Sequence, residues 1–460
     1  MLTGPRRQLD WDLDPLALVA CWPQDRALAV LSSGRTNARW SRWSVLAEPS
    51  QVGVTFDAAE ARPGLQEVEA RITSDDAPWL GYFAYDVAYG LERVGLSAKT
   101  DHAWPAAALR RCPGWLLHDR VEGRWWAGGD WAERASWIDA LPTMPACRNE
   151  DSFGTGPMTS GFTEPSYREA VLRCLDYIAA GDVFQVNLTQ RFAGPFVGDP
   201  RAAFLALTAG SPAWYGAYLE WPADEVRSVP ALALASISPE LLLELRADGA
   251  LVTRPIKGTR PAEAELEALK RSTKDAAELA MIVDLLRNDL GRVCGYGTVQ
   301  VDEARTIETH PTVQHGVATV SGRRHGSCGL ADVLRAVLPG GSITGAPKVR
   351  AMQIIDELEP VRRGPYCGAV GWLQGGASGG VAGGLNVAIR TALFEQPDAG
   401  VRGRVSFGVG GGIVADSVPA AEYEETLVKA SALRAGLARG RMAIPDDRVG
   451  SRPASQLVEF

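Results

Sequence analysis

The amino-acid sequence predicts an α+β fold. Many short segments either alternate apolar and polar residues or are apolar throughout, which is typical of strands joined as hairpins. Helical spacing of apolar residues occurs in isolated segments between these strands, and this favours α+β over regular strand–helix–strand winding. With 460 residues, 46% of them hydrophobic and 22% charged, the chain can bury a large core.

The first part of the chain contains strand-like runs at Ala27–Leu31 and Trp79–Tyr85. From about residue 105 to 160 the sequence is irregular. Prolines and glycines there indicate a linker or a long excursion, at Pro142, Pro145, Gly154 and Gly156. We therefore predict an N-terminal domain over residues 1–150, a catalytic domain over 160–440 and a C-terminal tail over 441–460.

A helix opens the second domain, because Thr163 is a suitable N-cap, Pro165 lies in the first turn and Gly181 ends the helical spacing. The strand predicted next has an apolar face of Phe184, Val186 and Leu188 and a polar face of Gln185, Asn187 and Thr189. Further strands are predicted at 213–220, 231–237, 240–246, 251–256, 366–374, 381–392 and 403–414, and helices at 262–270, 273–290, 330–337, 347–358 and 420–439.

Composition excludes several classes of function. A net charge of −8 without a dense run of lysine and arginine argues against nucleic-acid binding. The seven cysteines are scattered without a C-x-x-C pair, which disfavours both a disulfide scaffold and a zinc site. No apolar run approaches the roughly 18 residues of a membrane-spanning helix. We expect a cytoplasmic protein that binds neither membranes nor nucleic acid.

Lys257 stands between Ile256 and Gly258, at the end of an apolar run and before a tight turn. A lysine is a nucleophile only when neutral, and a free lysine near pH 7.4 is neutral in only about one part in a thousand. Burial or a neighbouring cation lowers the pKa and removes most of that cost. From these residues alone, Lys257 is either such a nucleophile or a solvated lysine at a strand end.

Two acidic clusters lie on predicted helices. Glu278 shares a helix face with apolar residues, so its carboxylate needs a partner, which is either an arginine (Arg287 or Arg292) or a metal ion. Glu422 and Glu425 lie one turn apart on another helix, with a lysine four residues further on. They form either a surface Glu–Lys pair or a second carboxylate arm for Mg²⁺, which prefers oxygen ligands.

Glycine-rich segments indicate close approaches to the backbone. Gly408–Gly412 lies in a strand pattern, where glycines accommodate either another strand or an anionic ligand. Pro339–Lys348 leads into a predicted helix, whose N-terminus favours anions. A lone histidine such as His315 is more often a core residue than a catalyst.

Together these segments resemble the chorismate-utilising enzymes, a family that includes anthranilate, aminodeoxychorismate, isochorismate and salicylate synthases. The segments follow the family's order across residues 160–435, and Ser41–Trp43 and Gly81–Phe83 add to the match. The matching segments are Phe184–Leu188, Ser238–Leu242, Pro255–Pro261, Glu278–Asp289, Gly345–Lys348, Ile389–Arg390, Gly410–Gly412 and Glu422–Lys429. The resemblance implies a fold like that of anthranilate synthase component I, with two stacked antiparallel sheets flanked by helices and with intertwined N-terminal and chorismate-binding regions.

The residue at position 257 narrows the implied activity. Anthranilate synthases are similar here but carry alanine, whereas aminodeoxychorismate synthases carry lysine. The resemblance implies that Lys257 attacks C2 of chorismate as the C4 hydroxyl leaves, and that ammonia then attacks C4 and expels the lysine. It assigns Glu240 as the general acid, a role that requires a raised pKa. Gln185 replaces the water-activating lysine of isochorismate-type enzymes, which disfavours hydroxylation.

The resemblance also implies a Mg²⁺ ion held by Glu278 and Glu425, with Glu422 and Asp275 acting through water. The implied substrate contacts are His315, Ser342, Tyr366, Arg390, Gly411, Gly412 and Lys429. Among them, Arg390 suits bidentate recognition of a carboxylate.

The implied product is 4-amino-4-deoxychorismate, made for p-aminobenzoate and folate synthesis. No glutaminase nucleophile segment is recognisable, so we expect ammonia from a separate glutamine amidotransferase subunit. Ser33, Ser41 and Pro212 resemble the family's N-terminal tryptophan pocket, in which Trp43 replaces a phenylalanine or tyrosine. The alternatives are the anthranilate synthase reaction, which releases pyruvate, and a catalytically silent subunit that binds chorismate or tryptophan.

Overall fold

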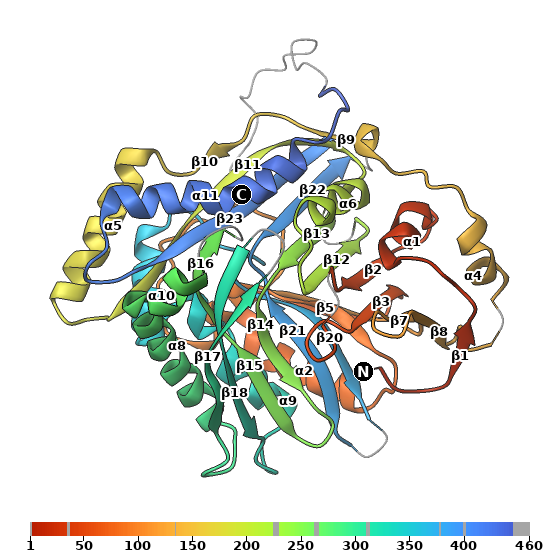
Figure 1. Ribbon diagram of the computed structural model, residues 1–460, viewed down its shortest axis with the longest axis horizontal. Coiled ribbons are helices and arrows are strands. Elements are labelled where there is room, and N and C mark those ends of the chain that lie inside the picture. Colours follow the sequence, from red (N-terminus) through yellow and green to blue (C-terminus); the bar gives the residue numbers. More distant parts are fainter. Residues whose placement is uncertain are drawn as a thin grey trace.

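The computed structural model describes residues 2–34, 37–133, 135–223, 230–261, 266–309, 313–376, 379–398 and 402–444. Two β-sheets form the centre of the fold, and helices lie on their outer sides (Figure 1). All strand pairs within the two sheets are antiparallel; the pairing of β5 with β20 and of β22 with β23 are examples. The predicted α+β class is therefore confirmed.

The larger sheet has 13 strands. In spatial order they are β1 (Arg6–Leu9), β8 (Arg124–Gly129), β7 (Gly114–Asp119), β3 (Trp43–Glu48), β2 (Ala29–Ser32), β12 (Tyr215–Trp221), β13 (Ala231–Ser238), β22 (Thr391–Asp398), β23 (Arg402–Ile413), β11 (Gln185–Gly198) and β10 (Thr159–Ser160). Two short strands also pair with β11, namely β9 (Phe153–Thr155) and β19 (Gly345–Ala346).

The smaller sheet has 10 strands. Their order is β16 (Ile256–Pro261), β18 (Val313–Arg323), β15 (Ala250–Arg254), β14 (Leu241–Leu245), β21 (Val381–Val387), β20 (Ala369–Gly375), β5 (Trp79–Phe83), β6 (Ala107–Arg111) and β4 (Gly53–Phe56), with β17 (Gln300–Thr309) paired to β18. The helices are α1 (Pro15–Cys21), α2 (Ala61–Thr73), α3 (Ala88–Leu91), α4 (Ser136–Ala140), α5 (Glu164–Ala179), α6 (Pro200–Gly210), α7 (Leu266–Arg271), α8 (Thr273–Gly291), α9 (Leu330–Val337), α10 (Lys348–Leu358) and α11 (Pro419–Leu437).

Both sheets combine strands from the beginning and the end of the chain. In the larger sheet β2 pairs with β12, and in the smaller sheet β5 pairs with β20. A shared apolar cluster between the sheets includes Tyr82 of β5, whose ring contacts Trp221 of β12 edge-on at 5.1 Å between centroids. This confirms the stacked sheets and the intertwined regions. How the chain divides into domains at residues 150 and 160 stays a prediction.

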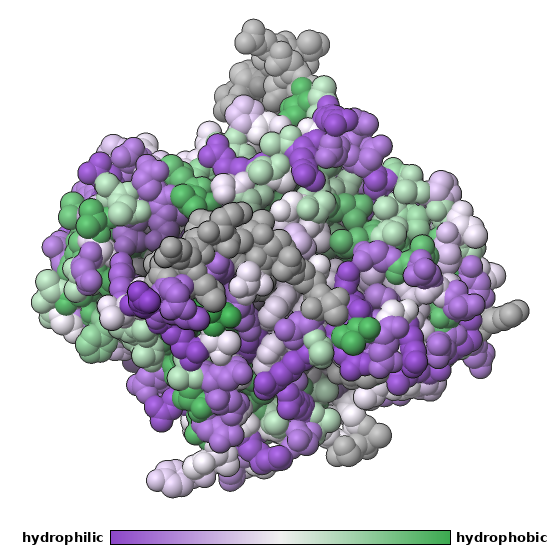
Figure 2. Space-filling view, in the orientation of Figure 1, coloured by the Kyte–Doolittle hydropathy of each residue, from purple (hydrophilic) through white to green (hydrophobic). Residues whose placement is uncertain are grey.

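The helices α6 and α11 pack against the outer side of the larger sheet, and α2, α8 and α9 cover the smaller one (Figure 1). The described part of the chain contains no helix long and apolar enough to cross a membrane. On the face shown in Figure 2, hydrophilic side chains are interspersed with small hydrophobic groups.

Local signals located several elements well. α5 begins with the predicted Thr163 cap, which forms a capping box with Ser166, and Gly181 follows with φ +83°. The helices at 273–291 and 330–337 also lie where helical spacing places them. The helix predicted at 262–270 is described only as α7, since residues 262–265 lie outside the described residues, as do residues 445–460 of the predicted tail.

Three expectations were wrong. The region after residue 105 is not a linker throughout, because 107–129 forms β6, β7 and β8, whose buried side chains include Trp115 and Trp125. The strand predicted at 381–392 is two strands that belong to different sheets, separated at Arg390. Phe184 is 72% exposed and precedes β11, while the polar residues Gln185 and Asn187 are buried, so both faces of this strand are covered.

Candidate active site

The predicted site residues come from both sheets and from two helices. Lys257 lies in β16, and Glu240 lies in the turn between β13 and β14. Glu278 belongs to α8, and Glu425 and Lys429 belong to α11. The charges of all four of these other groups act on the amine of Lys257. The fold therefore brings residues separated by up to 189 positions in the printed sequence, from Glu240 to Lys429, into one neighbourhood.

A bulge in β16 places Lys257. The pairing of β16 with β18 shifts register between Lys257 and Thr259. Gly258 has φ +74°, and a Cβ there would lie 2.9 Å from the Asp275 side chain, so only glycine fits. Lys257 is half-buried, and this burial lowers the pKa of its amine, against the opposing charge of Glu278. The neutral form, which a nucleophile requires, is thereby favoured.

Glu240 is a buried carboxyl with 5% of its surface exposed. Ser342 Oγ donates a hydrogen bond to Glu240 Oε1 at 2.6 Å. Burial raises the pKa of Glu240 to about 7, although the Ser342 hydrogen bond and the Lys257 charge act in the opposite direction. A carboxyl with a pKa near neutrality is suited to deliver a proton as a general acid.

The two glutamates of α11 flank Gly411 of β23. A Cβ at Gly411 would lie 3.3 Å from Glu422 Oε2 and 3.4 Å from Glu425 Oε1. Ser417 Oγ donates to Glu422 at 2.6 Å, and Lys429 Nζ forms an ion pair with Glu425 at 2.6 Å. Burial raises the pKa of Glu422; for Glu425 burial acts the same way, but Lys429 and other lysines hold its pKa below the usual value. The Glu–Lys pair thus exists, and it borders the predicted site.

Glu278 faces lysines. Lys274 Nζ lies 4.0 Å from Glu278 Oε1, whereas Arg287 pairs with Asp284 at 2.9 Å. Burial raises the pKa of Glu278, and the charges of Lys257 and Lys274 lower it. Because burial outweighs the lysines, this carboxylate would be stabilised by a further cation.

The donor chemistry of Glu278, Glu422 and Glu425 suits Mg²⁺, which binds oxygen ligands. Within the described ranges, no three Asp, Glu, His or Cys side chains stand close enough to hold one ion together. Mg²⁺ commonly retains several waters and uses only one or two carboxylates. The absent side chain of Gly411 leaves space between Glu422 and Glu425. These residues therefore fit a partly hydrated ion.

The glycines of β23 allow a neighbouring strand and nearby side chains to lie close to its backbone. A Cβ at Gly410 would collide with β11, the neighbouring strand, and one at Gly408 would overlap the ring of Tyr366. At Gly412 a Cβ would lie 2.9 Å from Nε2 of Gln185. Both amide atoms of Gln185 are buried and have no hydrogen-bond partner among the described residues. Gly412 and Gln185 therefore present polar backbone and amide groups on the same side of the larger sheet.

Arg390 has a backbone conformation that is unusual for a non-glycine residue, with φ +50°. Its side chain is half-buried, and burial alone lowers its pKa. No hydrogen bond or ion pair joins its guanidinium to another described side chain. A strained backbone and a half-buried cation that has no counter-charge among the described side chains are typical of a residue that binds an anionic ligand.

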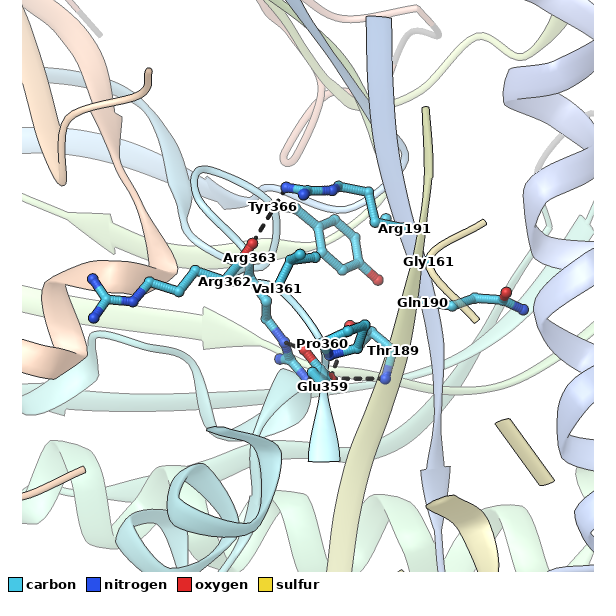
Figure 3. Close-up of a pocket in the computed structure, with 11 residues that line it drawn as sticks. Gly161, Thr189, Gln190, Arg191, Glu359, Pro360, Val361, Arg362, Arg363 and Tyr366 are labelled. Carbon is cyan, nitrogen blue, oxygen red and sulfur yellow. Dashed lines mark hydrogen bonds and ion pairs between the residues drawn. The ribbon is translucent and has the colours of Figure 1, made fainter. Parts of the chain in front are cut away.

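A buried ion pair that the sequence analysis missed lies next to the predicted site. Glu359, Arg363 and Tyr366 line a cavity of about 20 Å³ (Figure 3). Glu359 pairs with Arg363 at 2.6 Å, and Arg363 donates to the carbonyls of Ile343 at 2.8 Å and Asn187 at 2.6 Å. The pair ties β11 to the loop before α10. Its i,i+4 spacing in sequence is the same as that of a surface Glu–Arg pair, so no local signal distinguishes it.

His315 lies near Lys257, whereas Lys348 lies in an ion pair between two helices. His315 is buried in β18 opposite Thr259 of β16, and it is the neighbour of Gly316, the residue that pairs with Lys257. Lys348 forms an ion pair at 2.6 Å with Asp289 of α8, and both side chains are nearly buried. Lys348 therefore joins α10 to α8.

A second cavity of about 470 Å³ lies between the sheets beside the N-terminal strands and is lined by Ser33 and Trp43 among others. Of the predicted tryptophan-pocket residues only Ser33 is among those that line this cavity. Ser41 is buried between Trp40 and Arg42, which line it, and Pro212 lies two residues before Trp214, which also lines it. Ser33 Oγ donates to the carbonyl of Trp43 at 2.9 Å. The volume is within the roughly 300–1,000 Å³ of small-molecule sites.

Comparison with known proteins places this arrangement in a family. The model of the family described as chorismate binding enzyme matches residues 34–435. The chain therefore belongs to the chorismate binding enzymes, as its motifs predict. Aminodeoxychorismate synthase component 1 of Escherichia coli (strain K12) is 34% identical over 91% of this chain and 97% of that protein.

Two further comparisons agree. Aminodeoxychorismate synthase component 1 of Klebsiella aerogenes is 40% identical over 76% of this chain and 75% of its own length. The crystal structure of anthranilate synthase component I from Streptococcus pneumoniae superposes with a TM-score of 0.72 at 25% identity, over 94% of this chain and 99% of that one. The predicted fold type, family and enzymatic character are thereby confirmed.

Proposed function

We propose that this chain is the component that aminates chorismate at C4 to give 4-amino-4-deoxychorismate. One observation carries the proposal. Burial lowers the pKa of the Lys257 amine and raises the pKa of the Glu240 carboxyl to about 7, and the charges of the two groups act on each other. Burial thus favours both the neutral amine and the protonated carboxyl that the reaction requires. The relatives named aminodeoxychorismate synthase component 1 support the same reaction.

The reaction proceeds in two displacements. The neutral amine of Lys257 attacks C2 of the ring, both ring double bonds shift towards C4, and the C4–O bond breaks while Glu240 gives its proton to the departing hydroxyl, which leaves as water. Ammonia then attacks C4, both double bonds return, the bond between C2 and Lys257 breaks, and the new C4 ammonium gives one proton back to Glu240. Chorismate and ammonia thus give the amino product and water, and the lysine is regenerated.

Arg390 and Lys429 supply positive charge for the two carboxylates of chorismate. Arg390 has a guanidinium available for a bidentate contact, and Lys429 lies beside Gly410–Gly412, where its Nζ donates to the carbonyl of Gly410 at 2.8 Å. His315, Ser342, Tyr366, Gly411 and Gly412 complete the proposed contacts. A Mg²⁺ ion held by Glu278 and Glu425, with Glu422 through water, would neutralise a substrate carboxylate when bound.

The proposed ammonia source is a separate glutamine amidotransferase subunit, which the designation component 1 of the relatives supports. We further propose that the product serves p-aminobenzoate and folate synthesis in the cytoplasm. All seven cysteines are free thiols, as expected of a protein in a reducing compartment. The 470 Å³ cavity beside Ser33, Ser41 and Pro212 is the proposed tryptophan site, testable by equilibrium dialysis with labelled tryptophan.

The decisive experiment is a product assay with chorismate, Mg²⁺ and ammonium chloride. We expect 4-amino-4-deoxychorismate without pyruvate, and no product from Lys257→Ala. Substantial anthranilate and pyruvate would instead establish the anthranilate synthase reaction, the reaction named for the neighbour from S. pneumoniae. Tight chorismate binding without turnover at any ammonium concentration would indicate a silent subunit.

The covalent step has its own test. Intact-protein mass spectra recorded during slow turnover should show a chorismate-derived adduct that is absent in Lys257→Ala. Amination without any adduct would contradict the role of Lys257 while leaving the product assignment intact.

A further inference from the structure

Ser342 lies in a short 3-10 helix, Gly341–Ile343, that is held from several sides. Arg363 donates to the carbonyl of Ile343 at 2.8 Å. Thr344 Oγ1 donates to the carbonyl of Gly340 at 3.0 Å, which closes the turn. The side chain of Leu285 on α8 occupies the space where a Cβ of Gly341 would stand, at 2.7 Å. The backbone that carries Ser342 is therefore held in place from several sides.

The backbone of Glu240 is also held by hydrogen bonds. Its amide donates to Ser238 Oγ at 3.2 Å, and its carbonyl accepts from the amide of Val387 at 3.0 Å. Ser238 Oγ in turn donates to the Val387 carbonyl at 2.6 Å. Because the backbones of both residues are held, the fold keeps Ser342 Oγ and Glu240 Oε1 at the hydrogen-bond distance of 2.6 Å.

We propose that Ser342 is a positioning residue for the general acid: it occupies Oε1 of Glu240, so that the transferable proton is carried on Oε2. This role rests on the proposed function and adds to the predicted contact of Ser342 with substrate. A serine hydroxyl has one proton to donate, and Ser342 directs it to Oε1. The acid proton is then confined to the other carboxyl oxygen.

The hydrogen bond also changes during the reaction. As the C4–O bond breaks, the proton moves from Oε2 to the leaving oxygen, water departs, and Glu240 becomes a carboxylate. A hydrogen bond to an ionised acceptor is stronger than one to a neutral acceptor. Ser342 therefore stabilises the charge that develops on Glu240 more than it stabilises the ground state, which is the requirement for lowering a barrier.

The groups that face Glu240 set the background for this effect. Lys257 of β16 and Lys429 of α11 are the cations whose charges act on it, and the backbone amide of Ile256 also favours the ionised form. The Cys367 thiol interacts with it electrostatically. Burial is the largest influence and raises its pKa; Ser342 is the largest opposing one. Loss of a hydrogen bond to a charged group should raise the pKa of Glu240 by about one unit or more.

The test is an infrared difference titration of the protonated carboxyl band, with Glu240→Gln used to assign the band of Glu240. We expect a midpoint near pH 7 in the wild type, since burial raises the pKa of Glu240 to about 7. The midpoint should move at least about one unit higher in Ser342→Ala, and Ser342→Thr should restore it because threonine keeps the hydroxyl. Ser238→Ala is the matched control: it removes the bonds of the Ser238 hydroxyl at the same turn, but the Val387 amide still holds the Glu240 carbonyl, so the midpoint should stay within a few tenths of a unit.

A kinetic measurement accompanies the titration. The inflection of the pH–kcat profile that Glu240→Gln abolishes should shift upward in Ser342→Ala by the same amount, with a fall in kcat larger than any change in KM. An unchanged midpoint in folded Ser342→Ala, or an equal shift in Ser238→Ala, would overturn the proposal. The titration needs no turnover, so a different reaction product would refute the proposed function without affecting this result.

Discussion

Replacement of Arg363 by methionine tests whether the buried ion pair beside the site holds the fold together there. Glu359 and Arg363 pair at 2.6 Å, with side-chain exposures of 4% and 2%. Methionine fills much of the volume but leaves the Glu359 carboxylate buried without its cation. It also leaves the carbonyls of Ile343 and Asn187 without their donor.

The magnitude follows from these contacts. Removing one partner of a buried ion pair costs about 3–5 kcal/mol. Each buried carbonyl that loses its hydrogen bond adds about 1 kcal/mol or more. We therefore expect Arg363→Met to lower the free energy of unfolding by at least about 4 kcal/mol, a large share of the roughly 5–15 kcal/mol of a typical protein.

Urea unfolding followed by circular dichroism measures this change, and the chain offers a matched control. Arg168 and Glu164 form a pair of the same residue types at the same i,i+4 spacing, but their side chains are 48% and 50% exposed. Arg168→Met should cost only about 0.3–0.5 kcal/mol. If Arg363→Met were within 1 kcal/mol of the control, the reasoning about burial would be refuted. The double variant Glu359→Leu with Arg363→Met should be more stable than Arg363→Met alone, because no charge is left unpaired.

Three further outcomes follow from the site. Arg390→Lys should raise KM for chorismate at least about tenfold with a smaller change in kcat, because lysine keeps the charge but not the bidentate contact; equal KM values would contradict the carboxylate role. Gly408→Ala should lower kcat/KM at least about tenfold by displacing the Tyr366 ring, whereas Gly210→Ala, whose Cβ meets nothing within 4 Å, should not. Glu240 is the proposed proton donor, and because burial raises its pKa to about 7, it is protonated below that pH and ionised above it. The rate of adduct formation in rapid-quench experiments should show an inflection near pH 7 that Glu240→Gln abolishes, and an inflection that persists would exclude Glu240 as its origin.

The sequence determined those features that depend on neighbouring residues. The cap of α5 at Thr163, its end at Gly181 and the bulge-forming glycine after Lys257 are all visible in short segments. The order of the motifs was enough to indicate the family, because each motif keeps its own local form wherever the fold places it. Lys257 and Glu240 are both singled out in this way.

Only the tertiary structure decided which of these groups act on one another. Ser342 meets Glu240 across 102 positions, and Arg363 reaches Asn187 across 176. The break at Arg390 arises because the chain passes there from the smaller sheet to the larger, a change that no periodicity records. Burial and hydrogen bonding shift a pKa through all groups that surround a side chain in space, and the positions of those groups are set by the packing of the two sheets.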